Sequence, residues 1–364
     1  MNTPLRLSIV IPTFNERSNI CELLSHLEAT LGATGWEVIF VDDDSPDETA
    51  SLVRTIAQTD PRVRCLQRIG RRGLSSACID GMLASAGPII AVMDADLQHD
   101  ETILPKMLSE IELGDADVVI GTRYGAGGST GDWSRGRLLL SRIATAASRG
   151  VLRQHVSDPM SGFFMLRRTV FDASVRDLSG LGFKILLDIL TTVNQPLRVA
   201  EVPYQFRERF AGESKLDGLV VWEYGMLLAH KKVGRYLPVR FLAFAIVGGL
   251  GVLIHMVALA VVLKGFHTSF AGAQSIATAT AMLGTFTLNN VLTYRDQRLK
   301  GWAWLRGLVT FMVACGVGAV PNIGIATYLF ETHTPWALAG LAGVLVSAVW
   351  NYAVTQLYTW RWRS

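Results

Sequence analysis

Two carboxylates and an amide stand close together in the first third of the chain. Asp94, Asp96 and Gln98 follow the apolar run at residues 88–92, which is typical of a buried strand. They are therefore expected at the carboxyl end of that strand, where open α/β sheets bind their ligands. Their oxygens suit a divalent cation that substrate phosphates also hold. The structural alternative is a solvated loop that caps the next helix, and so short a motif does not exclude it.

The composition divides the chain into a charged part and an apolar part. Mean hydropathy is +0.31 over 364 residues, 34 of them glycine, which is too apolar for an ordinary soluble protein of two domains. Most charged residues precede Arg240, and four long uncharged stretches follow it. This pattern predicts a soluble domain joined to a membrane domain.

Net charge and cysteine usage narrow the function classes. A net charge of +3 does not indicate nucleic-acid binding. The four cysteines lack metal-binding spacing, so we expect them to be reduced and the soluble domain to be cytosolic. The apolar run at residues 7–11 is too short for the core of a signal peptide.

Short apolar strands alternate with helices over about the first 120 residues. Strands are predicted at residues 7–11, 37–41, 63–66, 89–93 and 118–120, and helices at 15–31, 48–58, 74–86 and 101–113. This alternation is typical of parallel β-α-β units with right-handed crossovers. The predicted fold class is α/β, with a Rossmann-like, mostly parallel sheet that binds a nucleotide.

Polar and aromatic residues also follow the first two predicted strands. Phe14 comes after the first strand and can stack on a nucleobase. Asp43 or Asp44, after the second, can accept hydrogen bonds from a base or a ribose. The alternative for residues 42–47 is an acidic turn around Pro46.

Seven sequence blocks resemble the inverting family 2 glycosyltransferases with the GT-A fold, and most closely their polyprenyl-phosphate, dolichol-phosphate mannose synthase-like branch. The blocks are residues 11–16 (IPTFNE), 41–47 (VDDDSPD), 93–99 (MDADLQH), 121–124 (GTRY), 158–164 (DPMSGFF), 182–187 (GFKILL) and 212–216 (GESKL). The resemblance implies a GT-A fold and transfer of a hexose from a nucleotide sugar to a polyprenyl phosphate. It also implies Mg²⁺ or Mn²⁺ as cofactor.

The resemblance implies roles only where residues match the family motifs. Nucleotide contacts would come from Pro12, Phe14, Glu16, Val41, Asp43, Asp94 and Ala95. The metal would be bound by Asp94, Asp96 and Gln98, and the acceptor's phosphate by Arg123, Arg137 and Ser141. The residues expected to act in catalysis are Asp96, Arg123, Arg137, Lys184, Arg209 and Lys215.

The chemistry of a lipid phosphate supports these assignments. Its second pKa is about 6, so the acceptor is largely dianionic near neutral pH and needs charge compensation and alignment more than a base. Arginines supply both through bidentate hydrogen bonds. Arg137 and Ser141 would share one face of a helix, although a basic helix lying on membrane phosphates is the alternative there. The alternative for Lys184 is a structural lysine whose methylene stem lies along apolar surface while its ammonium group reaches water.

One block departs from the family pattern and leaves the donor open. Where many relatives have a lysine and a Gly-Leu-Gly run, residues 71–77 read RRGLSSA. Ser75 in place of glycine narrows the backbone freedom there. GDP-mannose is the first expectation for the donor and UDP-glucose the second.

Four stretches in the C-terminal part contain no Asp, Glu, Lys or Arg. They are residues 241–263, 266–294, 307–330 and 332–360. Each exceeds the roughly 20 residues that cross about 30 Å of hydrocarbon, which predicts four transmembrane helices. Basic residues gather in the linker 295–306 and after residue 360, so the positive-inside rule places both termini and the catalytic domain in the cytoplasm.

The predicted domains are a GT-A domain at residues 1–217, an interfacial amphipathic helix at 218–238 and a four-helix membrane domain at 239–364. The alternative for the middle segment is a soluble packing helix. The membrane domain resembles the GtrA-like four-helix domain, by its topology and by residues 241–251 and 287–290 with Tyr294. Five polar residues at membrane depth are expected to bond between helices, and a pathway for lipid phosphate is the alternative; they are His255, Asn289, Asn290, Asn322 and Asn351.

Two other functions remain open from the sequence. A different family 2 enzyme would extend a saccharide and would need a general base for the acceptor hydroxyl. A lipid-linked-sugar translocator or scaffold would use the soluble domain as a nucleotide-binding regulator. The expected partners are a nucleotide-sugar donor, a polyprenyl phosphate and the membrane, and a homo-oligomer stays open.

Overall fold

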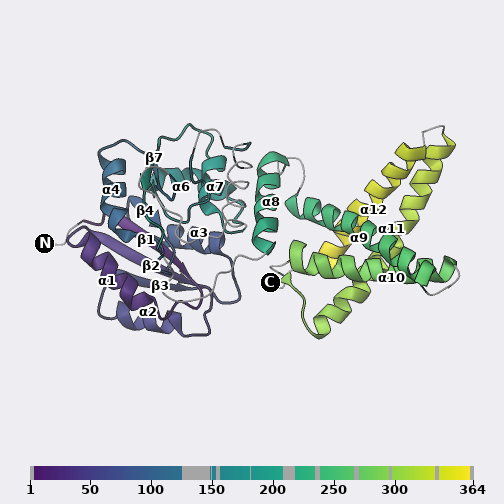
Figure 1. Cartoon of the computed structure of the whole chain (residues 1–364), viewed down its shortest axis with the longest axis horizontal. Coiled ribbons are helices and arrows are strands. Elements are labelled where there is room, and N and C mark those ends of the chain that lie inside the picture. The colour runs from purple at the N-terminus through teal and green to yellow at the C-terminus, as the bar shows by residue number, and fades with distance from the viewer. Residues whose placement is uncertain are drawn as a thin grey trace. The chain divides into compact units, whose positions relative to one another are not determined.

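The N-terminal part of the chain is built on one seven-stranded sheet (Figure 1). The computed structural model describes residues 4–124, 148, 150–152, 156–180, 182–207, 218–233, 238–265, 270–294, 297–332 and 336–360. The strands are β1 (Leu7–Thr13), β2 (Trp36–Asp42), β3 (Val63–Gln67), β4 (Ile89–Val92), β5 (Val118–Thr122), β6 (Phe164–Arg167) and β7 (Val199–Pro203). They lie in the order β3-β2-β1-β4-β6-β5-β7.

The sheet is parallel except at one strand. β6 runs antiparallel to both of its neighbours, β4 and β5, whereas β1 pairs in parallel with β2 and β4, and β5 with β7. The predicted mostly parallel α/β sheet is therefore confirmed. The antiparallel strand was not part of the prediction, because it lies beyond the region where strands and helices alternate.

Helices cover both faces of this sheet. They are α1 (Ile20–Leu31), α2 (Thr49–Ala57), α3 (Leu74–Ala84), η1 (Glu101–Ile103), α4 (Leu104–Glu112), α6 (Arg168–Ser174), η2 (Val175–Asp177) and α7 (Ile185–Thr192). Ile9 of β1 belongs to a core shared with α1, α2 and α4, whereas Val10 belongs to a core shared with α3, α6 and α7. Since both faces are covered, the strands appear in the sequence as continuous apolar runs.

Helix α1 begins later than predicted, at Ile20 instead of residue 15. Asn15 has a positive φ of 60°, which a right-handed helix cannot include. The backbone N–H of Asn15 donates to Ser45 Oγ at 3.0 Å, and that of Glu16 donates to Thr49 Oγ1 at 3.2 Å. The loop after β1 is thus tied to the loop after β2, and these contacts replace the first helical turn.

The ends of the strands bring distant segments to one edge of the sheet. β1, β2, β4, β5 and β7 all end there, and the antiparallel β6 begins there, with Phe164 opposite Val92. The segments after β1, β2, β4, β5 and β7 and the segment before β6 therefore meet at this carboxyl edge. Open α/β sheets place their ligands at such an edge.

The chain divides into two compact units, Met1–Lys232 and Val233–Ser364. Helix α8 (Gly218–Val233) packs on the first unit, where Leu227 contacts the core around Leu187 and Lys231 forms an ion pair with the buried Asp188. An interfacial function of α8 and the domain limits stated above stay predictions.

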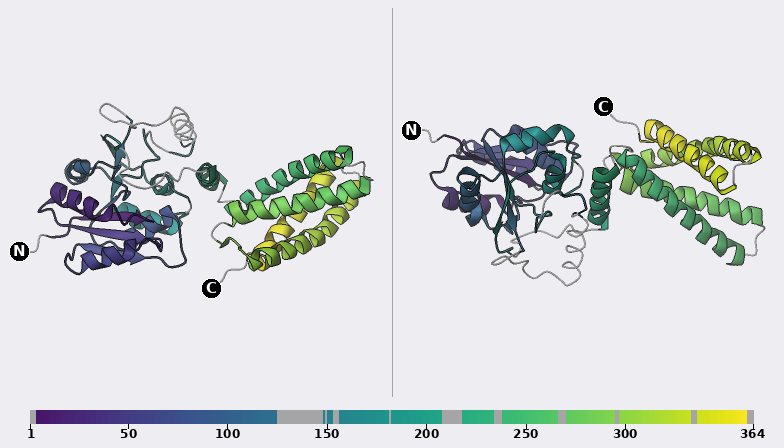
Figure 2. Two further views of the ribbon diagram at one scale, coloured as in Figure 1. Left: turned by 60° about the horizontal axis from the view of Figure 1, so that its bottom comes forward. Right: turned by 90° about the horizontal axis from the view of Figure 1, so that it is seen from above.

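The described residues of the second unit form four long helices arranged as two hairpins (Figure 2). They are α9 (Val239–Gly265), α10 (Phe270–Leu288) followed by the π-helical η3 (Asn289–Thr293), α11 (Trp302–Glu331) and α12 (Trp336–Tyr358). Each falls on one of the four uncharged stretches. Among the described residues, the segment Arg240–Val262 is long and apolar enough to cross a membrane. That four helices cross it stays a prediction.

Asn290 joins three parts of this unit beside an aromatic cluster. Its Oδ1 accepts hydrogen bonds from the backbone N–H of Leu299 at 2.8 Å and from Trp360 Nε1 at 3.2 Å, and its Nδ2 donates to the Leu299 carbonyl oxygen at 3.1 Å. The Trp360 ring stacks on Tyr294 with the centroids 4.0 Å apart. Leu299 lies in the segment before α11 and Trp360 just after α12, so Asn290 joins η3 to the ends of its neighbours, and bonding between the helices themselves stays a prediction.

Replacing Asn290 with alanine is expected to lower the thermal unfolding temperature of the purified protein by several degrees. The change removes three hydrogen bonds between η3, the segment at Leu299 and the buried Trp360, which we expect to cost roughly 1–3 kcal/mol of folding free energy. The matched control is Thr287→Ala, because the exposed Thr287 donates through Oγ1 to the Leu283 carbonyl oxygen within its own helix. Equal unfolding temperatures for the two variants would contradict a role of Asn290 in joining the helices.

Candidate active site

The turn after β4 carries the acidic residues predicted to bind metal. Leu97 adopts a positive φ of 61°, which is unfavourable for a leucine and makes the chain turn sharply between Asp96 and Gln98. Asp96 is only 7% exposed, and its Oδ1 accepts a hydrogen bond from the Gln98 N–H at 3.2 Å. The side-chain amide nitrogen of Gln98 donates to the Arg207 carbonyl oxygen at 3.1 Å, so a metal would have to use its Oε1.

The oxygen atoms at this turn fit Mg²⁺ or Mn²⁺ held jointly with a substrate. Within the described part of the chain, no group of three or more His, Cys, Asp or Glu side chains could hold a metal ion. Asp94 and Asp96 with the Gln98 amide would supply only part of a coordination shell. Such a partial shell is usual for cations that share their remaining positions with substrate phosphates.

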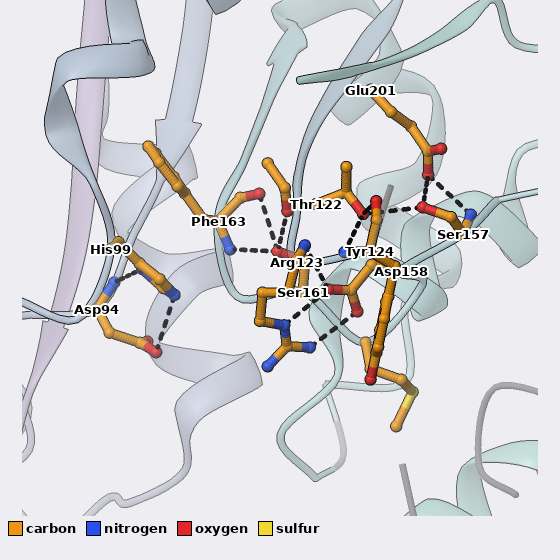
Figure 3. Close-up of polar contacts among 12 residues, drawn as sticks. Asp94, His99, Thr122, Arg123, Tyr124, Ser157, Asp158, Ser161, Phe163 and Glu201 are labelled. Atoms are coloured by element: carbon orange, nitrogen blue, oxygen red, sulfur yellow. Dashed lines mark hydrogen bonds and ion pairs between the residues drawn. The ribbon is translucent and has the colours of Figure 1, made fainter. Parts of the chain in front are cut away.

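His99 supports this turn and was not assigned a role from the sequence. It is 3% exposed, and its Nδ1 accepts a hydrogen bond from the Asp94 backbone N–H at 3.1 Å (Figure 3). The proton of a neutral ring is then on Nε2, which lies 3.7 Å from Asp94 Oδ2. Burial lowers the pKa of His99 and thus favours the neutral form. No sequence signal links residues five apart in a loop in this way.

Gly162 leaves room for the Asp94 carboxylate. A methyl group at Gly162 would lie 3.2 Å from Asp94 Oδ2 and 3.4 Å from His99 Cε1. Ser161, next to it, donates through Oγ to the Gly121 carbonyl oxygen at 2.7 Å, which holds this loop against β5. The close approach of backbone and carboxylate explains why glycine is suited to this position.

Replacing Gly162 with alanine is expected to lower the rate of the predicted hexose transfer about tenfold. The added methyl would crowd and displace Asp94, at a cost of roughly 1–2 kcal/mol. Turnover and thermal unfolding are both measured. The control is Gly225→Ala in α8, where an added methyl meets no atom within 4 Å. If Gly162→Ala is as active as this control, the packing against Asp94 does not matter for the site.

Arg123 lies in the same site and is held by a buried carboxylate. Its Nε and Nη2 donate to Asp158 Oδ2 and Oδ1 at 2.7 and 2.8 Å, and Asp158 is fully buried (Figure 3). Burial acts to lower the pKa of Arg123, but the hydrogen bonds and charge of Asp158 outweigh it and raise the pKa. Arg123 therefore remains charged, and Asp158 fixes its orientation.

Lys184 reaches the same loop. Its Nζ donates to the Met160 carbonyl oxygen at 3.2 Å, two residues after Asp158. The four other residues predicted to contact phosphates are outside the described residues. They are Arg137, Ser141, Arg209 and Lys215.

The residues predicted to bind the nucleotide lie at the ends of β1 and β2 and in the segments that follow β1, β2 and β4. Pro12 and Val41 are register partners in the two strands. The Arg72 guanidinium lies over the Phe14 ring, 4.4 Å from its centroid. Glu16 accepts a hydrogen bond from Asn19 Nδ2 at 2.7 Å, and Ala95 is buried beside Asp94. These positions form one side of the carboxyl edge.

Asp43 is joined to the block that departs from the family pattern. Its Oδ2 accepts a hydrogen bond from the Gly73 N–H at 2.7 Å, and its Oδ1 lies 3.3 Å from Nη1 of Arg68. Burial raises the pKa of Asp43, and these two contacts only partly offset it. Arg68 is 4% exposed and also donates to Ser76 Oγ at 2.7 Å. Sequence reasoning missed Arg68, because its partners are not near neighbours in any motif.

Two family descriptions match successive parts of the chain. Residues 8–174 match glycosyl transferase family 2, and residues 243–360 match the transmembrane domain named GtrA/DPMS. The chain is also similar to the dolichol-phosphate mannosyltransferase of Pyrococcus furiosus, with 34% identity over 98% of this chain and 99% of that protein. The chain belongs to the dolichol-phosphate mannosyltransferase branch of glycosyltransferase family 2.

Other relatives match a smaller share of this glycosyltransferase. The dolichol-phosphate mannosyltransferase of Saccharomyces cerevisiae is 36% identical over 60% of this chain and 84% of that protein. Among solved structures, glucosyl-3-phosphoglycerate synthase from Mycobacterium tuberculosis with Mn²⁺, UDP-glucose and phosphoglyceric acid is 20% identical. It has a TM-score of 0.46 and covers 62% of this chain and 79% of its own.

The resemblances predicted for both parts of this glycosyltransferase are confirmed by these matches. Nothing in the matches assigns single residues, so the roles of the site residues stay predictions. The structure nevertheless gathers the described ones at one sheet edge.

Proposed function

We propose that this glycosyltransferase moves mannose from GDP-mannose to a polyprenyl phosphate, with inversion at the anomeric carbon. The observation that carries the proposal is the full-length similarity to an enzyme named dolichol-phosphate mannosyltransferase, in a chain that gathers Asp94, Asp96 and Arg123 at one sheet edge. GDP-mannose is the donor to which this family name points most directly.

The proposed reaction exchanges one bond at the anomeric carbon for another. A phosphate oxygen of the acceptor bonds to that carbon, and the bond to the donor's diphosphate oxygen breaks, with its electron pair leaving on the diphosphate. Because a lipid phosphate is already largely ionised, the site needs to align it more than to deprotonate it. Attack from the face opposite the diphosphate inverts the centre.

Arg123 is suited to orient the acceptor phosphate. Asp158 holds its guanidinium on one side through two hydrogen bonds, so little side-chain freedom is lost when a phosphate binds. In the proposed site Arg137 and Ser141 also bind this phosphate, while Lys184, Arg209 and Lys215 contact donor or acceptor phosphates.

Asp94, Asp96 and Gln98 would hold a Mg²⁺ or Mn²⁺ ion beside the donor diphosphate. A bound cation would offset the charge that develops on the leaving diphosphate. His99 and Gly162 keep Asp94 in place for this task, and the turn at Leu97 does so for Asp96. Phe14 and Asp43 would contact the nucleoside.

A transfer assay tests the proposal. Detergent-purified protein is incubated with polyprenyl phosphate, Mg²⁺ or Mn²⁺, and labelled GDP-mannose or UDP-glucose in parallel, and labelled lipid is measured. Mannolipid from GDP-mannose is the expected result. Product from UDP-glucose alone would replace the proposed donor, and transfer only to a sugar hydroxyl would replace the proposed acceptor.

The membrane arrangement belongs to the same proposal. The GtrA/DPMS match makes the second unit a membrane domain, and we place both termini and the catalytic domain on the cytoplasmic side. Single cysteines near residue 300 and at residue 333 are expected to react from opposite sides of sealed vesicles. Labelling of both from one side would contradict four crossings.

A further inference from the structure

Arg207 lies outside the residues assigned above, yet its guanidinium contacts two carboxylates that directly follow the acidic turn. Its Nη2 donates to Asp100 Oδ1 at 2.7 Å, and its Nη1 donates to Glu101 Oε2 at 2.8 Å. Glu101 is 4% exposed and also lies 3.4 Å from His26 Nδ1. A buried carboxylate is costly unless a charge or hydrogen bonds compensate it, and Arg207 supplies both.

The backbone of Arg207 pairs with the residue at the centre of the turn. The Arg207 N–H donates to the Gln98 carbonyl oxygen at 3.0 Å, and the Arg207 carbonyl oxygen accepts from Gln98 Nε2 at 3.1 Å. Gln98 is thereby held through both its backbone and its side chain. The Gln98 N–H in turn donates to Asp96 Oδ1 at 3.2 Å. A displacement of Arg207 would therefore reach two of the three predicted metal ligands.

We propose that Arg207 is a positioning residue that fixes the Asp96–Gln98 turn for binding a divalent cation. The inference rests on the metal site in the proposed function. The guanidinium binds Asp100 and Glu101, which follow the turn, and the backbone of Arg207 binds Gln98 within it. Partners that orient metal ligands commonly change metal affinity 10- to 100-fold when they are removed.

Direct Mn²⁺ binding tests the proposal. The detergent-purified full-length protein is titrated with Mn²⁺ in the presence of GDP, and free Mn²⁺ is measured by electron paramagnetic resonance. Arg207→Ala is expected to weaken Mn²⁺ binding about tenfold. Arg207→Lys should weaken it too, because a lysine cannot contact both carboxylates in the same fork geometry.

The matched control is Arg198→Ala. Arg198 lies just before β7, and its guanidinium makes two hydrogen bonds to the Asp117 carboxylate at the opposite edge of the sheet. Its loss is expected to leave Mn²⁺ affinity unchanged. Glu101→Gln is the second variant, in case Arg207→Ala does not fold, and it should weaken Mn²⁺ binding in the same direction.

The outcomes separate the inference from the proposed function. If wild type binds Mn²⁺ and both Arg207→Ala and Glu101→Gln bind it equally well, the positioning role is wrong and the metal site stands. If wild type binds no Mn²⁺ and makes glycolipid without a metal, the metal part of the proposed function is wrong and this inference falls with it. Weaker binding in both variants but not in Arg198→Ala supports it.

Discussion

Replacing Asp96 with asparagine is expected to lower the rate of mannolipid formation about a thousandfold at saturating substrates. The change removes a nearly buried charge beside the predicted diphosphate site but keeps the size of the side chain. Groups that stabilise developing charge in a water-poor site contribute roughly 100- to 1,000-fold to the rate. The measurement is labelled glycolipid formed per enzyme at several Mn²⁺ concentrations.

The control for Asp96→Asn is Asp115→Asn. Asp115 is exposed, lies just before β5 at the opposite edge of the sheet, and has a positive φ that asparagine accommodates well. This control is expected to keep wild-type activity. Substantial activity in Asp96→Asn at all Mn²⁺ concentrations would remove Asp96 from the proposed mechanism.

Replacing Arg123 with lysine is expected to lower kcat/KM for polyprenyl phosphate about a hundredfold, with a much smaller change in KM for the donor. A lysine keeps the positive charge but cannot bond to Asp158 and a phosphate with the same planar geometry. The effect should therefore appear mainly when the acceptor concentration is varied. Initial rates at fixed donor and variable acceptor measure it.

A change at Asp158, the partner of Arg123, tests what the pair contributes to folding stability. Asp158→Asn keeps Arg123 but removes its buried counter-charge, which we expect to cost about 3–5 kcal/mol of folding free energy.

The control for Arg123→Lys is Arg62→Lys. The Arg62 guanidinium makes a similar pair of hydrogen bonds to Asp60, just before β3. A hundredfold lower kcat/KM for polyprenyl phosphate in Arg62→Lys would contradict the proposed acceptor role of Arg123. A change in Arg123→Lys that appears mainly in KM for the donor would contradict it too.

The sequence alone determined the layout of the soluble unit and the edge where its chemistry gathers. Buried parallel strands are apolar on both faces, so β1, β2 and β4 appear as short hydrophobic runs that end at polar residues. The motif at residues 93–99 could therefore be placed at a strand end. Because parallel strands share one carboxyl edge, Phe14, Asp43 and Asp94 could be placed together.

The tertiary structure alone decided which side chains support these residues. Arg207 meets Glu101 across 106 positions of sequence, and Arg123 meets Asp158 across 35. Both pairings depend on the antiparallel β6 and on β7 lying beside β5, and local hydrophobic periodicity carries no information about strand order. His99 turns back on Asp94 because Leu97 adopts a left-handed conformation that a leucine does not itself favour. Packing imposes that conformation, so the residues that bear the chemistry can be predicted from the sequence, but the residues that hold them require the fold.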